Sequence, residues 1–258
     1  MRRSVTVFIA GIGLLVHTAL WGAHPLITDD TGTQGIGNWQ VEVSGQYDSD
    51  RETRNGASQE SAGFQVAATL SYGMAEQVDM VLGLPYQGSR VKEDGVTRYD
   101  EKGIADATVE VKWRFFERDG LAFALKPGLR IPTGDDGKGL GAGRIGYHAF
   151  LIATKEAAPW AFHVNAGYIG NENKADEEQH LWQASLAATY EVLKGLKIAG
   201  NIGIERNRDR AAGKDPAFAL GGLIYSLSER VDIDVGVKYG LTAPETDWSF
   251  MAGMAVRF

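Results

Sequence analysis

Apolar and polar side chains alternate at every second position through most of the chain from Trp39 to the C-terminus. Within residues 231–239, for example, Val, Ile and Tyr side chains occupy one face, and Asp, Gly and Lys residues occupy the other. A helix would spread these charges around its circumference, whereas a strand places them on one side. The pattern therefore predicts β-strands with one apolar and one polar face.

The alternation predicts about twelve strands of roughly ten to thirteen residues each. They span residues 37–48, 62–74, 78–90, 104–117, 121–131, 143–155, 159–170, 179–192, 196–207, 217–228, 231–241 and 248–258. Between them, short turns alternate with longer polar stretches, which are 49–61, 91–103, 132–142, 171–178, 208–216 and 242–247. This sorting is typical of outer-membrane barrels, whose short periplasmic turns alternate with longer external loops.

The predicted fold is all-β, a transmembrane up-and-down antiparallel β-barrel. Ten strand residues tilted by about 40° rise about 25 Å, which is the height of the apolar band of such barrels. Closure leaves no strand edge unpaired in hydrocarbon, so the apolar face would meet lipid and the polar face a lumen. The alternative is a soluble sandwich whose core holds the same aromatic side chains.

The first residues have the organisation of a secretory signal. Arg2 and Arg3 precede an apolar run that ends near the small residues Gly22 and Ala23. The run is shorter than the ~20 residues of a membrane span, which favours a cleaved leader over an uncleaved anchor. We therefore expect a signal peptide over 1–23, a periplasmic N-terminal segment over 24–36 and the barrel over 37–258, located in the bacterial outer membrane.

The last predicted strand ends on an aromatic residue. Apolar side chains stand at every second position from Trp248 to the terminal Phe258. A terminal aromatic with this spacing resembles the signal that outer-membrane barrels present to the assembly machinery. Phe258 is therefore the candidate assembly signal, and the expected partners are the assembly machinery, outer-membrane lipid and lipopolysaccharide.

The composition and the residue spacings argue against several kinds of binding site and catalysis. A formal net charge of -7 disfavours a nucleic-acid surface, and the absence of cysteine removes thiolate nucleophiles and cysteine metal ligands. No histidine pair has the spacing of a zinc site, and the glycine-rich run 134–143 lacks the ending of a phosphate loop. We expect no metal, no cofactor and no catalytic residue, with a barrel hydrolase as the enzymatic alternative.

The polar strand faces carry acids and bases in near-equal number. Such a balance predicts a lumen laced with ion pairs and little preference for ions of either sign. The candidate lumen-lining residues of a pore are Glu42, Asp79, Glu110, Lys112, Arg114, Lys126, Arg130, Arg144, Glu191, Lys197, Glu205, Asp232, Asp234, Lys238 and Arg257. Twelve strands leave room either for a narrow pore or for an interior plugged by side chains.

Several large apolar side chains also share the predicted inner face. They either line a partly apolar pocket or only fill space. Strand 217–228 is ambiguous, because both of its faces carry such residues. The apolar candidates for the inner face are Phe116, Phe150, Phe218, Leu220, Ile224 and Met251.

Two segments resemble a known family: His24-Pro-Leu-Ile-Thr-Asp-Asp-Thr-Gly-Thr33, and Ile131-Pro-Thr-Gly-Asp135 leading to Gly139-Leu-Gly-Ala-Gly143. They are similar to the MetA-pathway of phenol degradation family of outer-membrane transporter-like barrels. The resemblance implies passive passage of small organic solutes, aromatic compounds among them. A plugged barrel with a structural or adhesive role is the other alternative.

The first of these segments carries a compact polar motif. We expect it to form a turn at the periplasmic mouth, with gating or docking of a partner as the alternative role. The motif residues are Pro25, Thr28, Asp29, Asp30 and Gly32.

Overall fold

The computed structural model describes residues 24–54 and 57–258, so the expected signal peptide lies outside the described part. Within these residues the elements are β1 (Trp39–Arg54), β2 (Ala57–Ala75), β3 (Val78–Glu93), β4 (Val96–Ile104), β5 (Ala107–Arg118), β6 (Leu121–Ile131), η1 (Asp136–Lys138), β7 (Gly146–Ala157), β8 (Trp160–Gly170), β9 (His180–Leu193), β10 (Leu196–Glu205), β11 (Ala217–Ser228), β12 (Val231–Gly240) and β13 (Trp248–Arg257). No helix in this part of the chain is long and apolar enough to cross a membrane.

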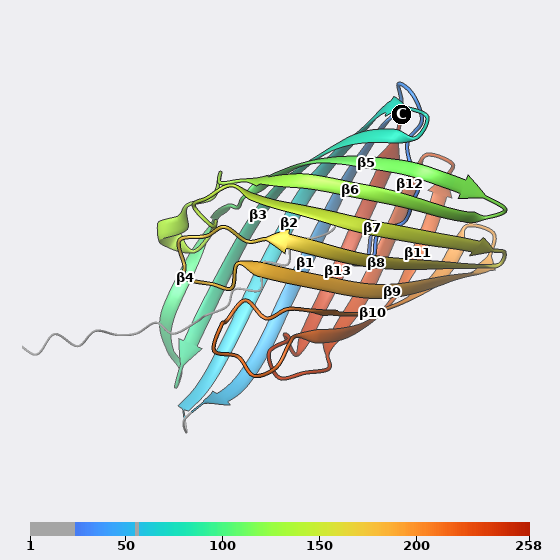
Figure 1. Cartoon of the computed structure of the whole chain (residues 1–258). Helices are drawn as coiled ribbons and strands as arrows, with labels where there is room; N and C mark the ends of the chain where they lie inside the picture. Colours follow the sequence, from blue (N-terminus) through green and yellow to red (C-terminus); the bar gives the residue numbers. More distant parts are fainter. Residues whose placement is uncertain (1–23, 55–56) are drawn as a thin grey trace, which may run out of the picture.

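The strands close into one antiparallel barrel (Figure 1). β13 pairs with β1, and the pairing of β2 with β3 completes the ring. β4 and β5 lie end to end beside β3, where β4 pairs with residues 86–93 and β5 with residues 78–83. Thirteen strands, two of which share one position, give twelve positions in the wall. The predicted up-and-down barrel is confirmed.

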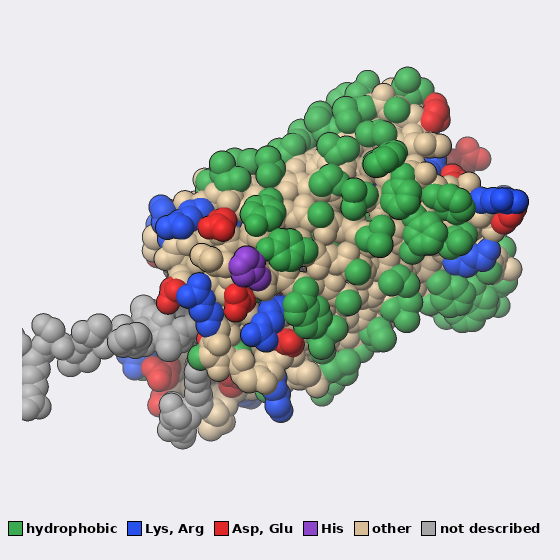
Figure 2. Space-filling model, viewed as in Figure 1, with side chains coloured by type: hydrophobic (Ala, Val, Ile, Leu, Met, Phe, Trp, Pro, Cys, Tyr) green, Lys and Arg blue, Asp and Glu red, His purple; other side chains and the backbone are tan. Residues whose placement is uncertain are grey.

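Apolar side chains cover the outside of the barrel. Figure 2 shows them spread over the wall, while charged side chains gather at the two ends. The exposed aromatic residues include Trp39, Tyr47, Phe64, Tyr86, Trp113, Trp160, Trp182, Tyr225, Tyr239 and Trp248. Burying this surface in hydrocarbon is favourable, and the polar backbone is satisfied by the strand pairing.

Two of the predicted long loops are instead paired strands. Residues 49–54 and 57–61 extend the β1–β2 hairpin, and residues 91–103 extend the β3–β4 hairpin, well past the neighbouring strands. The Arg90–Asp100 and Arg98–Glu93 ion pairs join β3 and β4 at 2.8 and 3.0 Å. Both faces of these extensions carry polar side chains, so the alternation of apolar and polar positions fades there.

The Asp94-Gly95 dipeptide is the local signal that identifies the second hairpin. Both residues have positive φ, 49° and 79°, as a two-residue turn with the twist of the flanking strands requires. Residues 55–56, between β1 and β2 in the sequence, lie outside the described part. We use "turn end" for the end of the barrel with the short turns β2–β3, β5–β6, β7–β8, β9–β10 and β11–β12, and "loop end" for the opposite end.

One part of the lumen is filled by an apolar cluster of inward side chains from β6 to β9. It contains Ala124, Phe150, Ile152, Ile169 and Leu181. The Phe150 ring lies over Gly167 of the neighbouring strand, where a Cβ atom would meet ring carbons at about 2 Å. Here the predicted inward position of Phe150 holds, and the residue fills space.

Replacing Phe150 with Ala should destabilise the barrel by about 3–5 kcal/mol, because the ring is almost fully enclosed and its loss leaves a cavity. Urea unfolding in detergent, followed by tryptophan fluorescence, measures the change. An exposed replacement, Phe162→Ala, is the control and should change stability much less. Equal effects of the two substitutions would contradict the described packing.

Candidate functional site: a strap across the lumen

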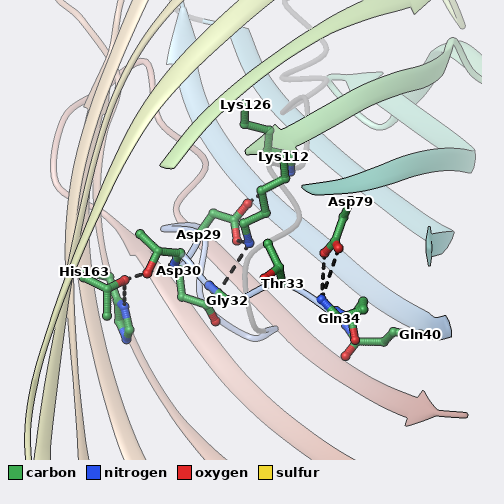
Figure 3. A network of polar contacts seen from close by, with 12 residues as sticks. Asp29, Asp30, Gly32, Thr33, Gln34, Gln40, Asp79, Lys112, Lys126 and His163 are labelled. Atoms are coloured by element: carbon green, nitrogen blue, oxygen red, sulfur yellow. Dashed lines mark hydrogen bonds and ion pairs between the residues drawn. The ribbon is translucent and has the colours of Figure 1, made fainter. Parts of the chain in front are cut away.

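Residues 24–34, which we call the strap, lie inside the barrel (Figure 3). Starting from β12, the strap contacts β10, β9, β6, β5 and β7 in turn and leaves toward β3. The expected turn at the periplasmic mouth is therefore corrected. The polar groups of the segment are too numerous to stay unpaired, and the inner faces of seven strands supply their partners.

The beginning of the strap is held by both polar and apolar contacts. His24 Nδ1 contacts the Asp234 carboxylate of β12, and Pro25 lies against Gly222 and Gly236, where Cβ atoms would meet it at under 3 Å. Leu26 is only 4 % exposed. It packs against an inward apolar group, which comprises Ala187, Ala199, Phe218, Leu220 and Met251, with Ile27 and Ile224 alongside.

The contact with Leu26 shows which face of β11, the strand that was ambiguous from sequence, points into the lumen. Phe218 and Leu220 face inward and Leu223 outward, because the strap supplies an apolar partner within the lumen. Phe116 was expected on the inner face, but the structure places it on the outer face. A bulge in the β5–β6 pairing between Arg114 and Phe116 shifts the register, and Phe116 is 41 % exposed beside Phe123.

The middle of the strap is fixed by hydrogen bonds to β9 and β10. Asn201 Oδ1 accepts from the backbone N–H groups of Ile27 and Thr28 at 2.8 and 3.1 Å. Thr28 Oγ1 accepts from Asn201 Nδ2 at 2.7 Å and donates to Ser185 Oγ at 2.8 Å. All three side chains are buried, so each contact satisfies a group that water does not reach.

Asp29 joins the strap to the opposite wall. Its carboxylate oxygens lie 2.9 Å from Lys112 Nζ and 3.1 Å from Lys126 Nζ. Lys126 also lies 3.3 Å from Glu110, which in turn contacts His148 at 2.7 Å. The charges are buried and compensate one another, so removal of a single member leaves an uncompensated charge in the lumen.

The strap returns to the wall through three further contacts. The Thr31 N–H donates to Thr154 Oγ1 at 3.1 Å, Thr33 Oγ1 donates to the Glu76 carbonyl, and the Gln34 N–H donates to the Asp79 carboxylate. The strap thus ends at the turn end of β3.

The Asp30 carboxylate of the strap faces Lys112 at 3.5 Å and accepts from the Gly32 N–H. Burial raises the pKa of this group, but Lys112, His163 and the Gly32 N–H lower the pKa more, to about 2. Asp30 is therefore ionised at neutral pH and adds to the acidic partners of Lys112.

Two polar cavities share the inner wall of β1, β2 and β3. The turn-end cavity, about 290 Å³, is lined by the strap together with Gln40, Glu42, Thr69, Ser71 and Arg257. The loop-end cavity, about 260 Å³, is lined by residues that include Asp48, Ser61, Gln65 and Gln87. Ser44, Ala67 and Pro85 form the cross-strand row between them. The strap contacts β5, β6, β7, β9, β10 and β12 and reaches this wall at its turn end, through Asp79 of β3.

The other expected lumen residues fall into four places. Arg257 joins Gln40 and Asp232 at the turn end, where Arg114 contacts the Glu76 carbonyl. Toward the loop end, Lys238 pairs with Glu245, Arg130 contacts Asn171 and Asp106, and Glu205 is half-buried. Glu191 and Lys197 are exposed and face each other at the turn-end rim. Arg144 stands in the loop before β7, exposed near Glu172, which corrects its expected inward position.

Four residues that enclose the loop-end cavity were not among the expected lumen residues. Glu245 and Arg208 come from polar stretches expected to be external loops, yet both are buried. Gln65 and Gln87 follow the inward alternation of β2 and β3, and this parity could have identified them.

Histidine contacts in the lumen belong to the anchoring of the strap. His163 Nδ1 lies 3.0 Å from Thr154 Oγ1, and the same hydroxyl accepts from Thr31.

Phe258 is exposed at the β13–β1 seam, where it exchanges backbone hydrogen bonds with Trp39. Its role in assembly stays a prediction.

The fold is that of solved outer-membrane proteins. An outer membrane channel from Pseudomonas putida F1 is 15% identical, with a TM-score of 0.67 over 89% of this chain and 98% of that one. The translocator domain of the autotransporter NalP from Neisseria meningitidis is 12% identical, with a TM-score of 0.56 over 88% and 91% of the two chains. The KdgM porin is 9% identical, with a TM-score of 0.55 over 85% and 99%. These neighbours are a channel, a translocator domain and a porin rather than enzymes.

The closed barrel with an apolar exterior is a protein of the bacterial outer membrane. No curated protein matches the sequence. A family match covers residues 28–258, which include most of the strap and all of the strands. The chain therefore belongs to the family described as "Putative MetA-pathway of phenol degradation".

Proposed function

We propose that this protein is a passive outer-membrane channel for small organic solutes, and that solutes follow the inner wall of β1, β2 and β3. The observation that carries this proposal is the pair of polar cavities at opposite ends of one wall. The strap crosses the lumen from β12 to β3 and lines one side of the turn-end cavity, so it narrows the path at that end.

The volumes of the two cavities set the size of solute that fits in the path. Cavities of about 260 and 290 Å³ exceed the ~150 Å³ that suffices for one benzene ring, so single-ring compounds fit. The family description, which refers to phenol degradation, supports aromatic compounds among the solutes. Passage down a concentration gradient requires no cofactor and no catalytic residue.

Reconstitution into planar lipid bilayers tests the proposal. Discrete conductance steps are expected from the folded protein at low voltage. A folded barrel that inserts and shows no steps would contradict it and would favour a plugged structural barrel.

The strap should remain seated while solutes pass. Thr28 Oγ1 and Ser185 Oγ are 2.8 Å apart, so cysteines at both positions are placed to form a disulfide, and the native chain has no cysteine to compete. We expect the conductance of the Thr28→Cys/Ser185→Cys variant to be the same before and after oxidation. A large loss on oxidation, reversed by reductant, would mean that solutes pass only when the strap leaves its seat.

A further inference from the structure

We propose that the loop-end cavity is a binding subsite for small organic cations that also carry a hydroxyl or carbonyl oxygen. The inference rests on the proposed channel, because it names the solutes that the channel would hold at its outer entrance. The cavity lies between the inward faces of β1, β2 and β3 and the loop segments 207–212 and 244–246. Its volume of about 260 Å³ suits a single-ring molecule rather than a bare ion.

The charge of the cavity lining selects the first group of the ligand. β1 contributes Asp48, Asp50 and Glu52 at every second position, and Asp209 and Glu245 lie opposite. Arg208 is the basic residue that lines the cavity, and Lys238 holds Glu245 at 2.7 Å. Carboxylates therefore outnumber bases, and a cleft lined by one sign of charge concentrates solutes of the opposite sign.

The carboxylates of β1 are hydrogen-bonded to neutral groups. Asp48 accepts from the Gln46 side chain at 2.7 Å, and Asp50 accepts from the Asp247 backbone N–H at 3.3 Å. These contacts hold the carboxylates in place and leave their charge in the cavity. An ammonium group can donate to more than one of them, and such charge-assisted hydrogen bonds are the strong ones.

A buried glutamine selects the second group. Gln87 lines the same cavity and is only 4 % exposed. Its Nε2 is without a hydrogen-bond partner in the described part of the chain. A buried amide donor left unpaired is costly, and an oxygen of the ligand would satisfy it. The subsite thus presents acceptors on β1 and a donor on β3, which fits a ligand with an ammonium group and a nearby oxygen.

Isothermal titration calorimetry on the folded protein in detergent tests this arrangement with three probes of equal ring size. They are 2-amino-1-phenylethanol (ammonium and hydroxyl), 1-phenylethane-1,2-diol (neutral) and mandelate (anionic). The amine should bind at least about tenfold more tightly than the diol, and mandelate most weakly, since hydrogen bonds to a charged group are roughly twice as strong as neutral ones. Equal binding of the amine and the diol would overturn the proposal.

Two substitutions separate the two ligand groups. Asp50→Asn should weaken 2-amino-1-phenylethanol about tenfold, and Gln87→Leu about fivefold, by loss of a charged and a neutral hydrogen bond respectively. Gln87→Leu should leave 2-phenylethylamine unchanged, because that probe lacks the hydroxyl. Glu156→Gln, an exposed change at the turn end, is the control. A Gln87→Leu variant that weakens both amines equally would contradict the assigned donor.

Calorimetry keeps this inference separate from the channel itself. Conductance without preferential binding of the amine would leave the channel standing and overturn the subsite. Binding without conductance would uphold the subsite and overturn the channel. Each variant is first shown to be a folded barrel by its heat-dependent shift on gel electrophoresis.

Discussion

Replacing Asp29 with Asn is expected to produce stepwise transitions to a second, larger conductance level, because the strap leaves its seat in the lumen more often. Asp29 is the acid that two buried lysines share, at 2.9 and 3.1 Å. Loss of its charge should cost the seated strap about 3 kcal/mol, which multiplies the ratio of released to seated strap about 100-fold. The barrel itself should remain folded, because Lys126 stays paired with Glu110 and Lys112 stays paired with Asp30. Single-channel recording in planar bilayers measures the frequency and size of the larger level.

Asp30→Asn is the matched control for this experiment. Asp30 lies on the same strap, but its side chain is about a third exposed and its contact with Lys112 is longer, at 3.5 Å. Solvent screens such a pair, so the larger level should appear far less often than in Asp29→Asn. An Asp29→Asn channel with the same levels and frequencies as the native protein would show that the strap does not narrow the path.

Replacing Ser44 with Trp is expected to reduce single-channel conductance by roughly an order of magnitude, because the indole ring fills a narrow polar passage. Ser44 points into the lumen from β1, in the row with Ala67 and Pro85 that separates the two cavities. The row has only small side chains on β1 and β2, so a large ring has no pocket to withdraw into. Recording at equal protein insertion measures the change.

Val43→Trp places the same ring one residue earlier, on the outer face of β1, where Val43 is exposed to the lipid side. This variant should conduct like the native protein. Equal conductance of the two variants would place the solute path elsewhere in the lumen.

The barrel could be predicted from the sequence because its two strand faces meet different solvents. In the hairpin extensions both strand faces are polar, and the extensions, 49–54 with 57–61 and 91–103, were therefore expected to be loops. The bulge before Phe116 could not be predicted from the sequence either, because a one-residue register shift reverses the two strand faces without changing the composition of the strand.

The strap could not be predicted from local pattern. Asp29 is 83 residues from Lys112 and 97 residues from Lys126, so only the closed barrel brings them together. The lysines were expected in the lumen from alternation alone, but their acidic partner was assigned to a turn outside. The apolar inner face of β11 was a clue, since buried Phe218 and Leu220 need an apolar partner such as Leu26.

Swelling of liposomes that contain the purified protein tests the channel most directly. In isosmotic solutions of a small sugar or a single-ring alcohol, the liposomes should swell faster than protein-free liposomes, and a large oligosaccharide should give no swelling. A folded, inserted barrel that admits none of these solutes would contradict the account.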